Sequence, residues 1–133
     1  MTQEAFDAHQ QRVNGFPGVM VTPSPRKRKR EDGFKSQAEA DYAQRLNNDP
    51  DVAQWKYESL TFVLSHVGRG VRYTPDFLVE KVGGALELHE VKGAYVRPDA
   101  SMKFKLAVGQ YPEFTWVWAQ KHRNGWHMVR PEG

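Results

Sequence analysis

The feature that most constrains the fold of this chain is a succession of strand-like segments in its centre. They are rich in aromatic and β-branched residues and span residues 55–67, 71–82 and 85–92. Gly68-Arg69-Gly70 separates the first two, and Gly83-Gly84, a hairpin turn signal, separates the last two. Because short turns of this kind join antiparallel strands, the sequence predicts a three-stranded meander at the centre of a small sheet.

A helical pattern lies on each side of this meander. Ser36 and Glu39 fit the capping box that begins a helix, and Asn47-Asn48-Asp49-Pro50 ends it. A second helix begins at Asp99 or Ser101. Its buried face is formed by Phe104, Ala107, Val108 and Tyr111. Two further strands follow, at 114–120 and 126–130. This order predicts a mixed α/β (α+β) fold in which two helices cover a small sheet.

The first 33 of the 133 residues differ from the rest. They contain Pro23-Ser24-Pro25 and a run of five basic residues: Arg26, Lys27, Arg28, Lys29 and Arg30. The run contributes +5 to a net charge of +3, so everything else carries −2. We expect residues 1–33 to form a flexible basic arm that binds DNA phosphates, or else a solvated tail or localisation tract, and residues 34–133 to form one folded domain.

Several function classes are excluded by what the sequence lacks. Without cysteine, the chain cannot form disulfides or a thiolate metal site. It contains no apolar run of membrane-spanning length, and its first residues do not resemble a secretory signal. No phosphate-binding loop, dinucleotide fingerprint or Ser-His-Asp grouping is present. We therefore expect a cytoplasmic protein with no organic cofactor and no membrane partner.

Acidic residues in the predicted strands form the candidate site. Pro75-Asp76 lies within the second strand, and Glu90-Val91-Lys92 ends the third. Pairing about Gly83-Gly84 places Asp76 opposite residue 91, and a one-residue shift in the turn would align Asp76 with Glu90. Glu39 is a third acid, which lies on the inward stripe of the first helix with Tyr42, Ala43 and Leu46, although a capping role explains it as well.

This set of residue types suits phosphodiester hydrolysis. Two neighbouring carboxylates favour a hard divalent cation, and Mg²⁺ is usually held by one or two carboxylates with phosphate oxygens and waters. Lys92 would place a positive charge near the attacking water and the charge that develops on the phosphate. The motif Glu-x-Lys alone carries little weight, and its position beside Pro75-Asp76 is what makes it a candidate.

Ser36-x-x-Glu39 on a helix, Tyr73-Thr74-Pro75-Asp76-Phe77-Leu78 on a strand and Glu90-Val91-Lys92-Gly93 on the next resemble the PD-(D/E)XK nuclease superfamily. The sequence around Asp76 and the glycine at position 93, after Lys92, are similar to those of phage Holliday-junction resolvases of the endonuclease I type. The spacing also resembles a family of small, uncharacterised phage proteins of the same superfamily. The resemblance covers residues 34–118.

The resemblance implies a restriction-endonuclease-like α-β-β-β-α-β core and a Mg²⁺-dependent endonuclease, with Mn²⁺ as a substitute. Asp76, Glu90 and the backbone carbonyl of Val91 would bind the metal, Glu39 would complete the site, and Lys92 would orient or activate the water. The interval between Asp76 and Glu90 is longer than in the resolvases, which bears on junction selectivity. A phage-encoded homodimer acting on branched DNA in a bacterial host is the expected setting.

Lys103 and Lys105, at the start of the second helix, are further candidates for DNA contact, although a solvated helix face explains them too. Three alternative functions stay open. The chain would be a general or site-specific nicking or restriction-like nuclease, a catalytically silent DNA-binding protein of the same fold, or an α/β interaction module in which the motif is accidental.

Overall fold

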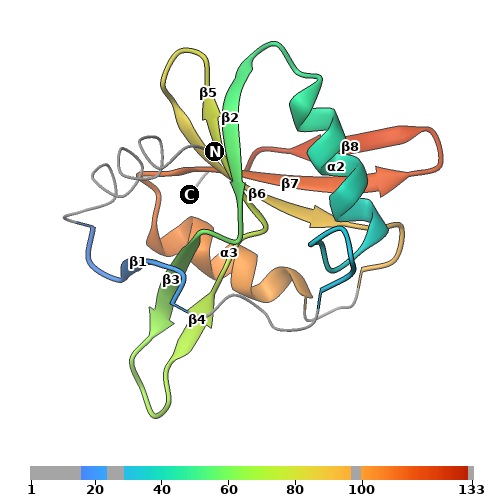
Figure 1. Cartoon of the computed structure of the whole chain (residues 1–133). Coiled ribbons are helices and arrows are strands. Elements are labelled where there is room, and N and C mark those ends of the chain that lie inside the picture. Colours follow the sequence, from blue (N-terminus) through green and yellow to red (C-terminus); the bar gives the residue numbers. More distant parts are fainter. Residues whose placement is uncertain (1–15, 24–28, 97–99, 132–133) are drawn as a thin grey trace.

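The computed structural model describes residues 16–23, 29–96 and 100–131 (Figure 1). Their helices and strands confirm the predicted mixed α/β class. In chain order they are β1 (Val19–Val21), α2 (Gln37–Asn47), β2 (Val52–Tyr57), β3 (Leu60–Ser65), β4 (Val71–Tyr73), β5 (Phe77–Lys81), β6 (Leu86–Lys92), α3 (Ala100–Gln110), β7 (Thr115–His122) and β8 (Gly125–Val129). Neither helix in these residues is long and apolar enough to cross a membrane.

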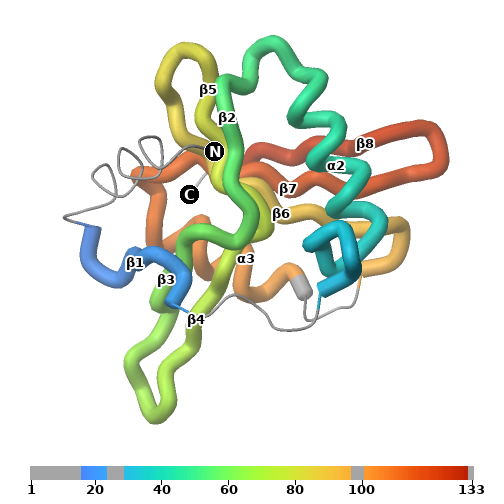
Figure 2. The backbone as a smooth tube through the Cα atoms, viewed as in Figure 1, coloured from blue at the N-terminus to red at the C-terminus, as the bar shows by residue number. Residues whose placement is uncertain are grey.

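The main sheet has five strands in the order β2-β5-β6-β7-β8. Strands β2, β5 and β6 form an antiparallel meander. Helix α3 then carries the chain back, so that β7 pairs with β6 in parallel, and β8 returns antiparallel to β7 (Figures 1 and 2). In the main sheet and its helices, α2, β2, β5, β6, α3 and β7 therefore follow the predicted α-β-β-β-α-β order.

Two strands that the sequence predicted as continuous are broken, and both breaks lead into a second sheet. The segment 55–67 divides at Glu58, a residue with a left-handed φ of 48°, into β2 and β3. The segment 71–82 divides at Thr74-Pro75-Asp76 into β4 and β5, because proline cannot donate to the ladder. The two breaks lie side by side, since the Glu58 amide donates to the Asp76 carbonyl at 2.8 Å.

The predicted turn at Gly83-Gly84 is confirmed, with a register one residue from the prediction. Phe77 pairs with His89 and Leu78 with Leu88 in the β5–β6 ladder. Gly84 has a φ of +94°, a conformation that glycine adopts without steric cost. Continued by one residue past the end of the ladder, this register aligns Asp76 with Glu90.

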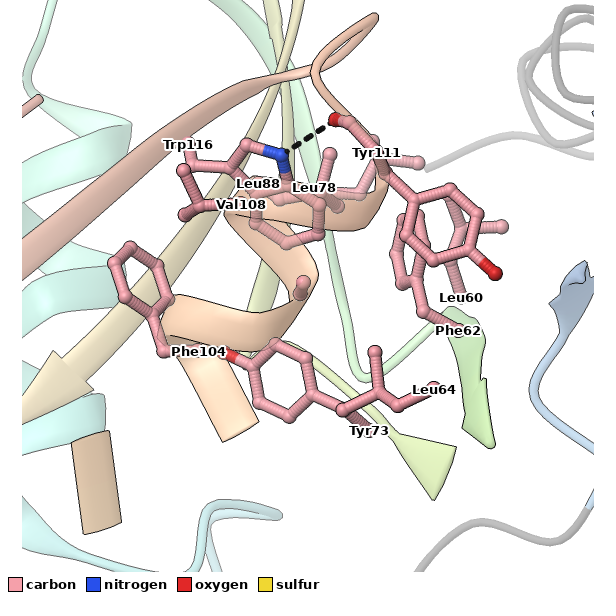
Figure 3. Close-up of a cluster of buried hydrophobic side chains, with 11 residues drawn as sticks. Leu60, Phe62, Leu64, Tyr73, Leu78, Leu88, Phe104, Val108, Tyr111 and Trp116 are labelled. Carbon is pink, nitrogen blue, oxygen red and sulfur yellow. Dashed lines mark hydrogen bonds between the residues drawn. The ribbon is translucent and has the colours of Figure 1, made fainter. Parts of the chain in front are cut away.

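The main sheet is covered on both faces. Tyr42, Ala43 and Leu46 of α2 pack on Phe77, Val79, Val91 and Ala119 on one face. On the other face, α3 and the small sheet bury a larger cluster in which the Trp116 indole donates to the Tyr111 carbonyl at 2.9 Å (Figure 3). Strand β6 is therefore buried between two layers, and a polar side chain on it needs a partner or a function.

Part of the predicted arm belongs to the folded domain, which corrects the boundary at residue 33. Strand β1 pairs antiparallel with β3 and completes the small sheet β1-β3-β4. Phe16 packs against Phe114 with ring centroids 5.0 Å apart, and the Thr22 amide donates to the Ser59 carbonyl. The proline and glycine content of this segment did not indicate a strand, because a three-residue edge strand depends on its partner.

Candidate active site

Asp76 lies at the corner where the chain passes from the small sheet to the main sheet. Its side chain is fully buried. Oδ2 accepts a hydrogen bond from the Val91 amide at 2.8 Å, and Oδ1 lies 2.7 Å from the Lys35 ammonium. Because β4 ends at Tyr73 and β5 begins at Phe77, Asp76 lies between the two strands, and its side chain accepts from the backbone of β6.

Glu90 projects from β6 toward the same region. It follows Leu86 and Leu88 on the sheet face that α3 covers, as the alternation of a strand requires. Tyr73 of β4 donates its hydroxyl to Oε1 at 2.6 Å, and the Lys92 ammonium lies 2.8 Å from Oε2. Lys92, predicted as the catalytic cation, is thus paired with the acid two residues before it.

Glu39 is brought to the site by α2, where the predicted inward stripe is buried as expected. Ser36 caps the helix by accepting from the Glu39 amide at 3.2 Å. The Glu39 carboxylate does not close a reciprocal capping box. Its Oε1 accepts from the Lys35 amide at 3.1 Å and the Tyr57 hydroxyl at 3.0 Å, and its Oε2 lies 3.2 Å from the Lys35 ammonium.

The three acids influence one another's ionisation. Burial and the neighbouring Asp76 raise the pKa of Glu39 to about 7. Burial and the charge of Asp76 likewise raise the pKa of Glu90 to about 7. Burial opposes ionisation of Asp76 as well, but the Lys35 charge and the hydrogen bonds to its carboxylate hold its pKa below the usual value. The site therefore holds one firmly ionised acid beside two that are reluctant to ionise.

Two residues of this cluster were missed by the sequence analysis. Lys35 lies against Asp76 and Glu39, and 4.0 Å from Glu58 Oε2. Glu58 is a buried acid at the break between β2 and β3, and the Lys29 ammonium lies 3.3 Å from its Oε1. The spacing of Lys35 four residues before Glu39 was a usable signal. Nothing in the sequence around Glu58 distinguishes it from a surface residue of an amphipathic strand.

The predicted DNA-binding residues fall in different places. Arg26, Lys27 and Arg28 lie outside the described residues. Lys29 pairs with Glu58, and Arg30 pairs with Asp32 at 3.3 Å. Lys103 and Lys105 are exposed on α3, where the Lys103 ammonium donates to the Arg72 carbonyl at 3.1 Å. The structure thus separates Lys29 and Arg30, which lie near Glu58 and α2, from the two lysines of α3.

The acids suit a divalent cation chemically, but their present arrangement serves other partners. Asp76, Glu90 and Glu39 supply oxygen ligands, and Glu39 Oε2 is a buried atom that lies 3.2 Å from the Lys35 ammonium. Among the described residues, no three His, Cys, Asp or Glu side chains are grouped as metal ligands. The Lys35 ammonium pairs with Asp76 and Glu39, whereas the Tyr73 hydroxyl and the Lys92 ammonium contact Glu90. Binding of a cation by these acids would require the two ammonium groups to move away.

The raised pKa of Glu90 predicts a stability difference that depends on pH. A carboxyl whose folded pKa is raised stabilises the fold below its unfolded pKa of 4.5, and that contribution is lost as the pH rises through about 7. In EDTA, the unfolding free energy of Glu90→Gln relative to that of the wild type should therefore rise by on the order of 2–3 kcal/mol from about pH 5 to about pH 8. Urea unfolding measures this gain.

The variant comparison removes contributions common to both proteins, such as that of buried His89, whose lowered pKa acts in the opposite direction. Asp41→Asn is the matched control, because hydrogen bonds with Lys121 and Gln37 hold the pKa of this partly exposed acid below its usual value. An unchanged difference between Glu90→Gln and the wild type at the two pH values would contradict the prediction.

Comparison with known proteins gives a family whose function is unknown. No curated protein and no solved structure matches the chain. Residues 28–124, which include both helices, the site and the main sheet up to β7, match the family DUF1064, described as a protein of unknown function. The chain belongs to the DUF1064 family.

Proposed function

We propose that this protein is a magnesium-dependent DNA endonuclease that hydrolyses phosphodiester bonds. The observation that carries the proposal is the proximity of three buried acids from α2, the β4–β5 corner and β6, with Lys92 paired to one of them. Buried carboxylates with raised pKa values at a sheet corner are costly to maintain, and they are typical of sites that hold a cation.

In this proposal, Asp76 and Glu90 hold Mg²⁺ with the Val91 carbonyl, and Glu39 completes the site. The cation, when bound, supplies Lewis-acid stabilisation of charge on phosphate oxygens. Asp76 is suited to be the permanent ligand, because its low pKa keeps it ionised. The Val91 amide, which donates to Asp76, fixes the carboxylate in place.

Lys92 is suited to stabilise negative charge that develops on the phosphate or to orient the attacking water. Its ammonium lies 2.8 Å from Glu90 and 6.0 Å from the centre of the Trp118 ring, so it is held at the edge of the site. About a quarter of its side chain is exposed, at 23%, which leaves it accessible to a substrate phosphate. These contacts support the role that the resemblance gave it.

The order of elements supports the same proposal. The acids occupy a first helix, a strand corner and the next strand of an α-β-β-β-α-β core, as the resemblance to PD-(D/E)XK nucleases implies. The rest of the proposal follows from that resemblance: Mn²⁺ as a substitute metal, a phage-encoded protein in the bacterial cytoplasm, branched or recombination DNA as the substrate, and a homodimer, since each chain offers one site for two strands.

One observation favours a second candidate, a DNA-binding protein of this fold without activity. Lys35 already neutralises Asp76 and Glu39, as a lysine that replaces a metal would. The presence of Lys92 beside Glu90 weighs toward the enzyme, because a silent protein has no need of this pair.

Cleavage assays distinguish these functions. The protein is incubated with supercoiled plasmid, linear duplex and a four-way junction, in Mg²⁺, in Mn²⁺ and in EDTA. We expect cleavage with either metal and none in EDTA, with the junction cut preferentially. Equal cutting of all substrates would favour a general nicking or restriction-like nuclease. Binding without cutting would favour the silent protein, and neither binding nor cutting would favour an interaction module.

Lys92→Met tests the role of the lysine in the same assay. We expect cleavage to slow on the order of 100-fold, because one charge that stabilises the transition state is lost. The Lys92 ammonium also lowers the pKa of Glu90, so its removal should move the acid limb of the pH–rate profile to higher pH. Lys121→Met, which removes a partly exposed lysine on β7, is the control. An unshifted profile would contradict the role of Lys92.

A further inference from the structure

The hairpin between β3 and β4 projects from the body of the molecule, away from the main sheet (Figure 1). Its outer part, residues 65–72, is here termed the hairpin finger. We propose that the hairpin finger is a DNA-contacting element that holds the duplex on one side of the candidate active site. The inference rests on the proposed function and extends it to the surface that receives the substrate.

The charge of this region suits a polyanion. Between Glu58 and Asp76 the sequence contains no acid, whereas Arg69 and Arg72 of the finger are both exposed. The neighbouring helix α3 also contains no acid and exposes Lys103 and Lys105. Four cations therefore lie on two adjacent elements with no carboxylate of their own, in a chain whose remaining charge is close to neutral.

The finger and the β3 residues that lead into it are fixed to α3 and to the residue after α3 at three points. Lys103 donates to the Arg72 carbonyl at 3.1 Å, and Gln110 donates to the Leu64 carbonyl at 3.1 Å. The Tyr111 hydroxyl donates to the Val63 carbonyl at 2.6 Å. These bonds hold the base of the finger against the domain, so binding would not need to order it first, and a preformed surface binds at lower entropic cost.

The finger also leads directly into the active site. Strand β4 ends at Tyr73, whose hydroxyl donates to Glu90. Because residues 66–70 lie outside the β3–β4 ladder, the strand rise of about 3.3 Å per residue is an upper limit, and the tip at Gly68 lies at most about 17 Å from Tyr73. A strand of duplex DNA advances about 3.4 Å per phosphate, so a phosphate near Tyr73 and one near the tip would be at most about five nucleotides apart.

The tip exposes one apolar side chain. Val67 is 86% exposed, between positions that carry a histidine and a glycine. A single exposed valine is unremarkable on a protein surface, but one at the tip of a basic hairpin has the position of the apolar wedges that enter DNA grooves. We assign Arg69 and Arg72 to phosphate contacts and Val67 to contact with unstacked bases, which branched DNA presents without the energetic cost of unstacking.

Equilibrium binding in EDTA tests the finger apart from cleavage. A fluorescent linear duplex and a four-way junction of the same sequences are titrated with full-length protein over a series of salt concentrations. We expect Arg69→Ala/Arg72→Ala to bind both DNAs roughly tenfold more weakly and to reduce the slope of log K against log salt by about 1.8. We expect Val67→Ser to bind the junction severalfold more weakly and the duplex unchanged. Arg123→Ala, an exposed arginine in the β7–β8 turn, is the matched control.

The outcomes separate this inference from the proposed function. If the wild type cleaves DNA in Mg²⁺ while the double arginine variant binds DNA as tightly as Arg123→Ala does, the role of the finger is overturned and the proposed nuclease activity stands. Finger-dependent binding without any cleavage supports the finger and overturns the enzyme. A wild type that binds neither DNA overturns both. Circular dichroism melts confirm that the variants fold, as expected for exposed side chains whose backbone contacts are retained.

Discussion

Asp76→Asn should abolish magnesium-dependent cleavage, with a fall in rate on the order of 10³-fold or more. Asp76 is the one acid of the site whose pKa is lowered, so it is the ligand that stays ionised when Glu39 and Glu90 are protonated. Asparagine keeps the size of the side chain and the acceptor for the Val91 amide while it removes the charge. Single-turnover cleavage of a labelled junction measures the rate.

Asp41→Asn is the matched control for this variant. It is the same chemical change on α2, two residues from Glu39, at a surface position where Asp41 pairs with Lys121. It should leave cleavage unchanged, because exposed pairs of this kind contribute little to a fold and none to the site. Full activity of Asp76→Asn, or equal loss in both variants, would overturn the assignment of Asp76 as the central ligand.

The parts of the fold that local periodicity specifies were predictable. Glu39, Tyr42, Ala43 and Leu46 recur at helical spacing, and all four are buried in α2. The glycine pair at 83–84 closes the β5–β6 hairpin as predicted, because the turn chemistry is local. The register differed by one residue, since it depends on which positions close the turn, and the difference improved the alignment of Asp76 with Glu90.

The parts that depend on tertiary contacts were not predictable. The break at Glu58 lies between aromatic and β-branched segments that read as one strand, and a left-handed φ on a glutamate leaves no sequence signal. Strand β1 was assigned to an arm because a three-residue strand acquires its stability from β3. The break at Glu58 and strand β1 produce the second sheet, which no helical or strand period indicated, whereas the turn at Gly68-Arg69-Gly70 that joins β3 to β4 was predicted.

The candidate acids were predictable, but their partners were not. Glu39, Asp76, Glu90 and Lys92 were selected from order and spacing, and the structure places them around one corner. The spacing of Lys35 four residues before Glu39 indicates that these two can pair, but only the folded chain shows that the Lys35 ammonium also lies against Asp76. The sequence search looked for acids that could bind a metal, whereas the positive charge that the structure places beside Asp76 and Glu39 is the ammonium of Lys35.

The position of Lys35 predicts a large effect on stability that depends on metal. Its ammonium lies 2.7 Å from the fully buried Asp76 carboxylate and 3.2 Å from Glu39. Lys35→Met keeps most of the aliphatic length and removes this charge. In EDTA at about pH 8, the variant should lose about 2–3 kcal/mol of unfolding free energy, because a buried carboxylate is left without its counter-charge.

Magnesium should reverse this loss. A cation that binds only the folded protein stabilises it by an amount that grows with its concentration relative to Kd, about 2.7 kcal/mol at 100 times Kd. Without the competing ammonium, Lys35→Met should bind Mg²⁺ about tenfold more tightly than the wild type, and thermal unfolding over a magnesium series measures both quantities. Lys121→Met, which breaks the partly exposed pair with Asp41, is the control and should show neither effect.

Cleavage by Lys35→Met then distinguishes two uses of this lysine. If the ammonium only occupies the acids until a cation displaces it, the variant should cut DNA at the wild-type rate in saturating Mg²⁺ and reach that rate at a lower metal concentration. A variant that is stabilised by Mg²⁺ and does not cut would instead place Lys35 among the groups that act on the substrate. A variant as stable as the wild type in EDTA would contradict the ion pairs as the counter-charge of the buried acids, because Asp76 has no other ammonium at this distance among the described residues.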